Sequence, residues 1–202
     1  MTAESLLALL RHALPDAVLD GADAVDQPCL VVGRESLVEA CRVLRDTPDV
    51  RFSLLAEMTA VDHWPSREPR FEVVYHLACL GVKDFPVQGE HPAAKRVRIK
   101  VPVGVEDPVV PTLCGLWPNA NWYEREIYDL FGIAFEGHPD LRRILMPEDW
   151  EGYPARKDSP LQVKVPVRAE SALLVTEQEF MENLKRQRVH RTVHAGPGKA
   201  EA

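Results

Sequence analysis

One stretch near the middle of the chain, residues 117–149, constrains the fold more than any other. Its first part predicts a helix, because four apolar residues repeat with the 3.6-residue helical period: Tyr123, Ile127, Leu130 and Phe131. Asn121 stands three residues before Glu124, which is the spacing of an N-terminal capping pair. Gly132 can end the helix because glycine adopts a left-handed conformation without steric cost. The stretch therefore predicts an amphipathic helix that runs into a loop.

The same helical spacing sorts the charged residues of this stretch. At about 100° per residue, Arg125 and Asp129 point away from the apolar stripe and are expected to form a weak surface pair. Glu126 falls at the edge of the stripe, between Trp122 and Leu130. A carboxylate there has to be neutral or paired, because an unpaired buried charge is costly. We expect a buried ion pair at Glu126, whose loss would cost about 3 to 5 kcal/mol.

Residues on both sides of the predicted helix end complete a long pattern of uncommon residue types. The pattern consists of Glu124-Arg125-Glu126, Asp129-Leu130-Phe131, His138, Arg142 and Ile144-Leu145. It resembles the signature of the 30-kDa subunit family of respiratory complex I, the proton-pumping NADH:quinone oxidoreductase. Similarity extends to residues 55–62, 71–77 and 152–160, so that it covers residues 30–165. Ala155 and Ser159 depart from the family, which commonly has Leu and an aromatic residue there.

The resemblance implies a cofactor-free connecting subunit of an α+β fold in the peripheral arm of the complex. Such a subunit packs against the large subunit that forms much of the quinone pocket and lies near the small iron–sulfur subunit. FMN and iron–sulfur clusters in partner subunits carry electrons from NADH to quinone, and proton translocation is coupled to this transfer. The chain would reach the cytoplasmic side of the cell membrane only as a peripheral part of the complex. The equivalent subunit of a membrane-bound hydrogenase or a ferredoxin-linked complex stays open, because other subunits choose the electron donor.

Charged residues in and after the predicted helix are candidates for contacts with these partners. Arginine forms bidentate bonds with carboxylates and is enriched at protein interfaces. We predict no catalytic, cofactor-binding or metal-binding residue, and we expect the signature or interface residues to be Glu124, Arg125, Glu126, Asp129, His138, Arg142, Arg143, Arg156, Lys157 and Asp158.

A stand-alone metal-dependent or acid–base enzyme is an alternative from a different class, using Glu124, Glu126, Asp129 and His138. Helical geometry disfavours it, because Glu124 and Glu126 diverge by about 160° around the helix axis. The sequence also lacks the His-Glu-x-x-His spacing of a zinc site. We therefore expect His138 to shape a turn with the Pro139 and Asp140 that follow it.

Composition narrows the classes of partner. The formal net charge of −7 argues against nucleic-acid binding as the main function, because such proteins need a positive face. The exception is a basic C-terminal segment, interpreted as a solvated tail rather than an RNA-binding one: Lys185, Arg186, Arg188 and Arg191. The four cysteines are scattered and predict small buried side chains rather than a disulfide, zinc site or iron–sulfur cluster: Cys29, Cys41, Cys79 and Cys114.

The sequence shows neither a membrane-spanning segment nor a secretory signal. No apolar run approaches the roughly 18 residues that a membrane-spanning helix needs. The first residues, Met1 to Leu6, lack the basic start and cleavage site of a secretory signal. We expect the chain to be cytoplasmic, or to reach a membrane through its partners.

The rest of the chain predicts an α+β domain with a small mixed or antiparallel sheet packed by helices. Helices are expected at residues 3–13 and 34–45, and strands at 17–19, 29–32, 71–80 and 95–103, the last two paired antiparallel. Residues 51–61 favour a strand, with a helix as the alternative. We place one domain at residues 1–149, ending with the signature helix and loop. Residues 150–202 are expected to form an extended, partner-docked arm with a short helix near 176–187 and a flexible tail.

Overall fold

A computed structural model describes residues 2–17, 19–80, 95–160 and 182 of the chain. Residues 1–160 form one unit, and a second unit, residues 161–202, lies almost wholly outside the described ranges. Apart from Glu182, which is helical, the predicted helix near 176–187, the arm beyond Pro160 and the basic tail lie outside the described residues. The boundary predicted at residues 149 and 150 stays a prediction.

A five-stranded mixed sheet organises the first unit. Its strands are β1 (Leu19–Asp23), β2 (Pro28–Val32), β3 (Leu54–Asp62), β4 (Phe71–Cys79) and β5 (Lys95–Val103), in the order β1-β2-β5-β4-β3. Strands β2 and β5 run parallel, and the other neighbours are antiparallel. The predicted antiparallel pairing of β4 with β5 is confirmed, with Tyr75 opposite Ile99. The predicted α+β class with a mixed sheet is confirmed as well.

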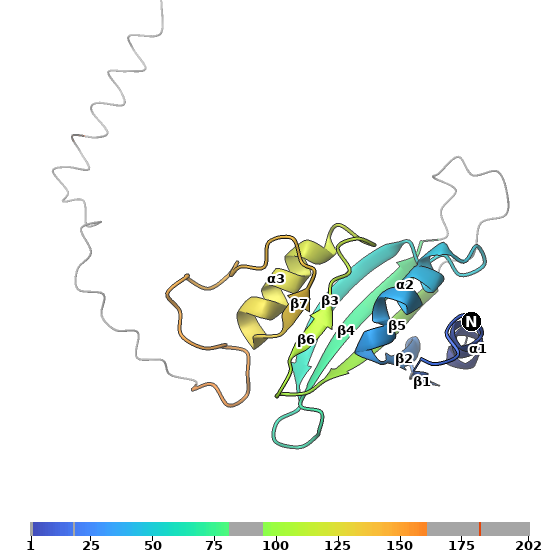
Figure 1. Ribbon diagram of the computed structural model, residues 1–202, viewed down its shortest axis with the longest axis horizontal. Helices are drawn as coiled ribbons and strands as arrows, with labels where there is room; N and C mark the ends of the chain where they lie inside the picture. The colour runs from blue at the N-terminus through green and yellow to red at the C-terminus, as the bar shows by residue number, and fades with distance from the viewer. Residues whose placement is uncertain (1, 18, 81–94, 161–181, 183–202) are drawn as a thin grey trace, which may run out of the picture. The chain divides into compact units, whose positions relative to one another are not determined.

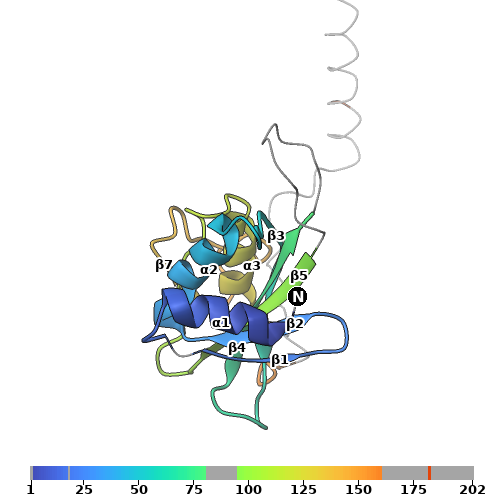
Figure 2. The same ribbon diagram turned by 90° about the vertical axis from the view of Figure 1, so that its right-hand side faces the viewer.

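The helices lie beside this sheet (Figures 1 and 2). They are α1 (Ala3–Ala13), a short 3-10 helix η1 (Arg34–Ser36), α2 (Leu37–Asp46) and α3 (Ala120–Phe131). Figure 2 shows α1 and α2 on one face of the sheet, while no helix among the described residues covers the opposite face. None of the described helices has the length and apolarity that crossing a membrane requires.

Alternating residues of β5 show how the sequence pattern becomes a core. The apolar residues point toward the helices and are buried: Val97, Ile99, Val101 and Val103. Arg98 and Lys100 alternate with them and remain partly exposed on the open face. There Lys100 Nζ lies 2.9 Å from Glu72 Oε2, which neutralises a carboxylate that is only 3% exposed. Strand β4 is buried along nearly its whole length, since it lies inside the sheet between β5 and β3.

A second, two-stranded sheet brackets α3 and was not predicted. Strands β6 (Val109–Pro111) and β7 (Ala134–Glu136) pair in parallel, one before and one after the helix. Three residues are too few to show a two-residue period, so the sequence held no signal for them. The sheet ties the two ends of the α3 segment together and therefore positions the loops on either side of the helix.

Candidate functional site

Helix α3 occupies the stretch that the sequence predicted. The prediction of its C-terminal cap is confirmed, and that of its N-terminal cap is wrong. Gly132 ends the helix in the left-handed region, at φ 71°, as expected. The N-terminal cap is Asn119 rather than Asn121, and its side chain forms no capping bond. Instead, Asn119 Nδ2 donates to the Leu55 carbonyl of β3 at 2.8 Å. The asparagine thus joins the helix to the sheet, a role that local spacing could not reveal.

Two further side chains fasten the α3 segment to the edge strand β3 and to Ser53, the residue just before it. Trp117 Nε1 donates to the Ser53 carbonyl at 3.0 Å, and the Tyr123 hydroxyl donates to the Ala56 carbonyl at 3.2 Å. Edge strands present unpaired backbone groups that can recruit other chains. The helix therefore covers the first half of this edge and is held rigidly against it.

Glu124 is the most deeply buried carboxylate of the helix, with no exposed surface. Its Oε1 accepts the Leu113 N–H at 2.7 Å, and its Oε2 accepts the Thr112 hydroxyl at 2.6 Å. Burial raises the pKa of Glu124 above its ordinary value, although the hydrogen bonds from Thr112 and Leu113 act in the opposite direction. The carboxylate serves as a bracket that holds the loop after β6 against α3.

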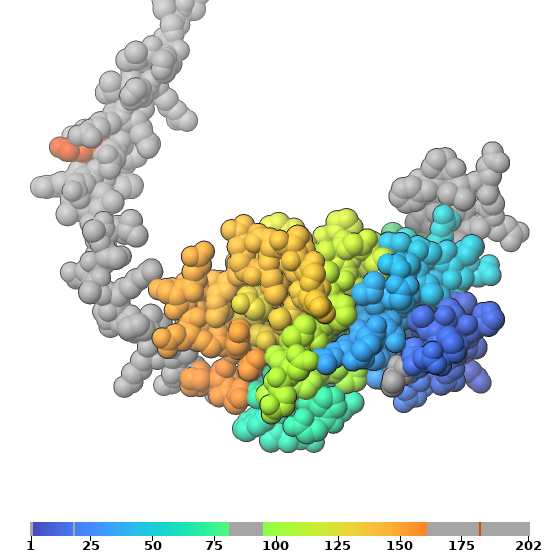
Figure 3. Space-filling view, in the orientation of Figure 1, coloured from blue at the N-terminus to red at the C-terminus, as the bar shows by residue number. Residues whose placement is uncertain are grey.

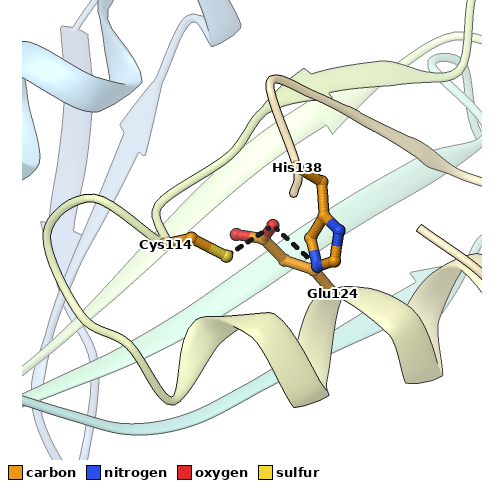
Figure 4. Close-up of side chains that lie close together, drawn as sticks. All are labelled: Cys114, Glu124 and His138. Atoms are coloured by element: carbon orange, nitrogen blue, oxygen red, sulfur yellow. Dashed lines mark hydrogen bonds and ion pairs between the residues drawn. The ribbon is translucent and has the colours of Figure 1, made fainter. Parts of the chain in front are cut away.

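Cys114 and His138 complete a cluster around Glu124 (Figure 4). Their possible ligand atoms all lie within 4.8 Å of one another, a spacing that would suit a metal ion. The hydrogen bonds of His138 do not fit this use, because Nδ1 accepts the Asp140 N–H at 3.0 Å and Nε2 donates to the Asn121 carbonyl at 3.2 Å. A histidine with both nitrogens engaged has no free lone pair to offer.

His138 therefore stabilises the bend that follows β7. The bond from the Asp140 N–H to its ring closes this bend, which agrees with the turn predicted at Pro139 and Asp140. Of the residues considered for a metal site, the structure brings together only Glu124 and His138, and it adds Cys114. Thr112 and Cys114 were missed, since neither stands at a recognisable spacing from the helix.

Asp129 lies at the opposite side of α3 from where the helical spacing placed it. The prediction of a surface pair with Arg125 is wrong, because Asp129 is completely buried. Its Oδ2 accepts the backbone N–H groups of Ile144, Leu145 and Met146 at 2.7–3.0 Å, and its Oδ1 accepts Arg143 Nη1 at 2.7 Å.

These bonds set the charge state of Asp129. Burial alone would raise the pKa of the Asp129 carboxyl, but its four hydrogen bonds, from Arg143 and from three backbone N–H groups, together lower the pKa below its ordinary value. The ionised carboxylate gathers the loop that follows β7 into a fixed shape over α3. In Figure 1 this loop, coloured orange, follows the yellow helix.

Arg125 and Arg143 fix the same loop from the side of its carbonyl groups. Arg125 donates from Nε to the Arg142 carbonyl and from Nη2 to the Arg143 carbonyl, both at 3.2 Å. Arg143 Nη2 donates to the carbonyls of Trp150 and Gly152 at 3.0 and 3.1 Å. By contrast, Arg142 is exposed and pairs at 2.9 Å only with the exposed Asp140 among the described residues. Arg143 is thus an internal brace, Arg125 braces the loop while its side chain stays partly exposed, and Arg142 faces outward.

The expected buried ion pair at Glu126 is wrong, because this side chain is exposed. The apolar stripe used to place it is itself only partly buried, since Tyr123, Leu130 and Phe131 remain half-exposed. The face that packs into the core instead carries Glu124, one turn before the buried Ile127.

Replacing Glu126 with Ala is now expected to change the free energy of unfolding by less than about 0.5 kcal/mol, as for other exposed sites. Chemical denaturation followed by circular dichroism measures this change. Glu124→Ala is the matched comparison, with an expected loss of about 1 to 3 kcal/mol because it orphans the Leu113 N–H. Equal losses of unfolding free energy in the two variants would contradict the assignment of Glu124 as buried and Glu126 as exposed.

Lys157 and Asp158 meet the far end of β3 and β4. Arg70, which is 6% exposed, donates from Nη2 to Asp62 Oδ2 at 2.8 Å and to Asp158 Oδ1 at 2.7 Å. The Lys157 N–H donates to Asp62 Oδ2 at 2.9 Å. The hydrogen bond from Arg70 lowers the pKa of Asp62 well below its ordinary range. The segment that follows residue 150 is thus held to the sheet up to Asp158, and Arg70 and Asp62 are residues of this site that the sequence did not single out.

Arg156 lies between two aromatic rings. Its guanidinium carbon is 4.6 Å from the ring centre of Tyr153 and 5.1 Å from that of Phe71, and its Nε donates to the Phe131 carbonyl. The aromatic stacking and the helix-end carbonyl both favour a cation at this place. Arg156 therefore acts as an internal brace in this unit.

Comparisons with known proteins show the family to which the chain belongs. Residues 30–165 match the model of the family described as respiratory-chain NADH dehydrogenase, 30 Kd subunit. The chain belongs to this family. The resemblance in the signature residues is confirmed, and membership makes the chain a subunit of a respiratory complex I, which works with other subunits of a membrane complex.

Individual members of the 30-kDa subunit family agree over most of the chain. The chain is 48% identical over 157 residues to an NADH-quinone oxidoreductase subunit of Roseiflexus sp. (strain RS-1), covering 78% of this chain and 83% of the relative. It is 41% identical over 153 residues to the subunit of the same name from Geotalea uraniireducens (strain Rf4), covering 76% and 85%.

Solved structures show the same fold. A trypsin-resistant fragment of Nqo5 matches with a TM-score of 0.50 and 32% identity, covering 68% of this chain and 98% of the fragment. A chain of the membrane-bound sulfane sulfur reductase, an archaeal respiratory membrane complex, matches with a TM-score of 0.59 and 22% identity, covering 98% of this chain and 97% of that chain. At this identity the second match shows a shared fold alone.

Proposed function

We propose that the chain is a connecting subunit without an active site of its own, in the peripheral arm of a proton-translocating NADH:quinone oxidoreductase. In this proposal it packs against the large subunit of the quinone pocket and the small iron–sulfur subunit, on the cytoplasmic side of the membrane. Electron transfer falls steeply with distance, so a protein that holds these partners in register contributes to the reaction without touching electrons.

One observation carries the proposal: the signature residues bond to the chain's own backbone. Asp129 accepts three backbone N–H groups, and Arg125 and Arg143 donate to backbone carbonyls on both sides of the same loop. A reactive site needs groups that are free to meet a substrate. Side chains that bond to the chain's own backbone make its surface rigid. A subunit that positions its neighbours requires such a surface.

The placement of the thiols supports a chain without a cofactor, with FMN and iron–sulfur clusters held by partner subunits. Cys29 lies in β2, Cys41 in α2, Cys79 in β4 and Cys114 in the loop after β6. Iron–sulfur clusters are held by several thiolates that converge on one point. Burial also raises the pKa of the Cys41 and Cys114 thiols, which disfavours the thiolate that a cluster needs.

Affinity purification of the tagged chain from gently solubilised membranes tests the proposal. We expect flavin- and cluster-bearing subunits to co-purify, and the preparation to reduce quinone with NADH. Co-purification with a hydrogenase or a ferredoxin-linked set would keep the connecting role and replace the electron donor. A chain that emerges alone, or that carries stoichiometric metal or flavin itself, would contradict the proposal.

A further inference from the structure

Two large apolar side chains of the signature segment are exposed although the backbone around them is firmly held. Trp122, on the outer side of α3, is 61% exposed, and Leu145, in the loop after β7, is 60% exposed. Most tryptophan side chains in folded proteins are largely buried. In Figure 3 the yellow and orange atoms of α3 and the following loop form one surface.

Arg125 joins Trp122 to the backbone of the loop that carries Leu145. Its guanidinium carbon lies 5.2 Å from the centre of the Trp122 ring, and its Nε and Nη2 atoms hold the carbonyls of Arg142 and Arg143. Leu145 is fixed by its own N–H, which donates to Asp129 Oδ2 at 2.7 Å. The Arg125 side chain and the backbone at Leu145 are therefore held in place before any partner arrives, which lowers the entropy lost when Trp122, Arg125 and Leu145 bind one.

The charge of Arg125 indicates which kind of partner group this patch can bind. Within the described part of the chain, Arg125 bonds to carbonyl groups and contacts the Trp122 ring, and it pairs with no carboxylate. Its neighbour Arg142 already pairs with Asp140. The patch thus offers one cation that no carboxylate of the described residues pairs with, bordered by apolar surface, on a chain whose net charge is −7.

We propose that Trp122, Arg125 and Leu145 form a docking site for a neighbouring subunit that presents a carboxylate beside an apolar side chain. The inference rests on the proposed connecting role and names the surface that performs it. Tryptophan and arginine dominate the residues that carry binding energy at protein interfaces. A carboxylate completes the bonding of Arg125, since charge-assisted bonds between guanidinium and carboxylate are the strong ones.

Purification of the whole complex with variant chains tests the apolar part. We expect Trp122→Ala to lower the amount of partner subunits recovered with the tagged chain about tenfold, the effect of a hot-spot residue. Trp64→Ala is the matched control, because Trp64 is 45% exposed in the turn between β3 and β4. Its recovery should equal that of the wild-type chain, and both variants should melt at the wild-type temperature.

Zero-length coupling with a carbodiimide tests the acidic part in the same complex. In Arg125→Lys the introduced amine should form an amide with a partner carboxylate, which joins the two subunits covalently. Arg96→Lys, on the open face of β5, is the control and should give no such adduct. Mass spectrometry of the adduct would then identify the acidic residue.

The outcomes separate this inference from the proposed function. If the wild-type chain recovers no partner subunits, the connecting role itself fails, and this docking site with it. If the wild-type chain recovers them and Trp122→Ala recovers as much as Trp64→Ala, the docking site is overturned while the connecting role stands. Coupling from Arg96→Lys but not from Arg125→Lys would move the acidic contact to the open face of the sheet and overturn the site as well.

Discussion

Replacing Asp129 with Ala is expected to lower the free energy of unfolding by about 3 to 5 kcal/mol, the usual cost of removing one partner from a buried ion pair. The change removes the acceptor of three backbone N–H groups and leaves Arg143, whose side chain is 19% exposed, without its carboxylate. Urea denaturation of the purified chain, followed by circular dichroism, measures the loss.

Asp140→Ala is the matched control for this prediction. Asp140 belongs to the same loop, but its side chain is 58% exposed and pairs with the exposed Arg142. Such surface pairs contribute about 0 to 1 kcal/mol. A loss at Asp129 no larger than the loss at Asp140 would contradict the role of Asp129 as the organiser of the loop.

Replacing Arg70 with Met is expected to cost a similar amount, about 3 to 5 kcal/mol. Methionine keeps much of the volume of the side chain but leaves Asp62, whose side chain is 2% exposed, without its cation. Asp158→Ala should cost no more than about 1 kcal/mol, because the Asp158 side chain is 45% exposed. If the two variants unfolded at the same urea concentration, Arg70 would not be the centre of this network.

The pH dependence of stability gives a second test of the buried carboxylates Asp62 and Asp129. The pKa of Asp62 is lowered in the folded chain, chiefly by Arg70, and that of Asp129 is lowered by its hydrogen bonds. Unfolded chains therefore bind more protons than folded ones below about pH 4, the ordinary range of these carboxyls, so stability is lost as the pH falls. Denaturation between pH 6 and pH 2 should show a smaller acid loss in Arg70→Met than in the wild-type chain.

Local patterns were sufficient where a residue's environment depends on its neighbours in sequence. The alternation of Val97, Ile99 and Val101 with charged residues predicted β5 and its buried face correctly. The helical spacing predicted α1 and α2, and Gly132 predicted the end of α3. Each of these features is set within a single helix or strand, because backbone period and glycine conformation act over a few neighbouring residues.

The charged residues of α3 show where local patterns failed. A helical wheel placed Glu126 inside and Asp129 outside, whereas the structure has the reverse, with Asp129 completely buried. The wheel assumes one buried face, but α3 is covered twice, by the sheet and by the loop after β7. The partners of Asp129 stand 14 to 17 residues further along the chain, and no period connects them.

The sequence by itself determined the family, through the resemblance of its signature residues, and the α+β class, through short-range periodicity. The tertiary structure alone decided which charges of that stretch are buried internal braces and which are exposed. The physical reason is that a buried charge is tolerated only where donors or acceptors converge on it. At Glu124, Asp129 and Arg70 those partners come from distant segments, and only folding brings them together.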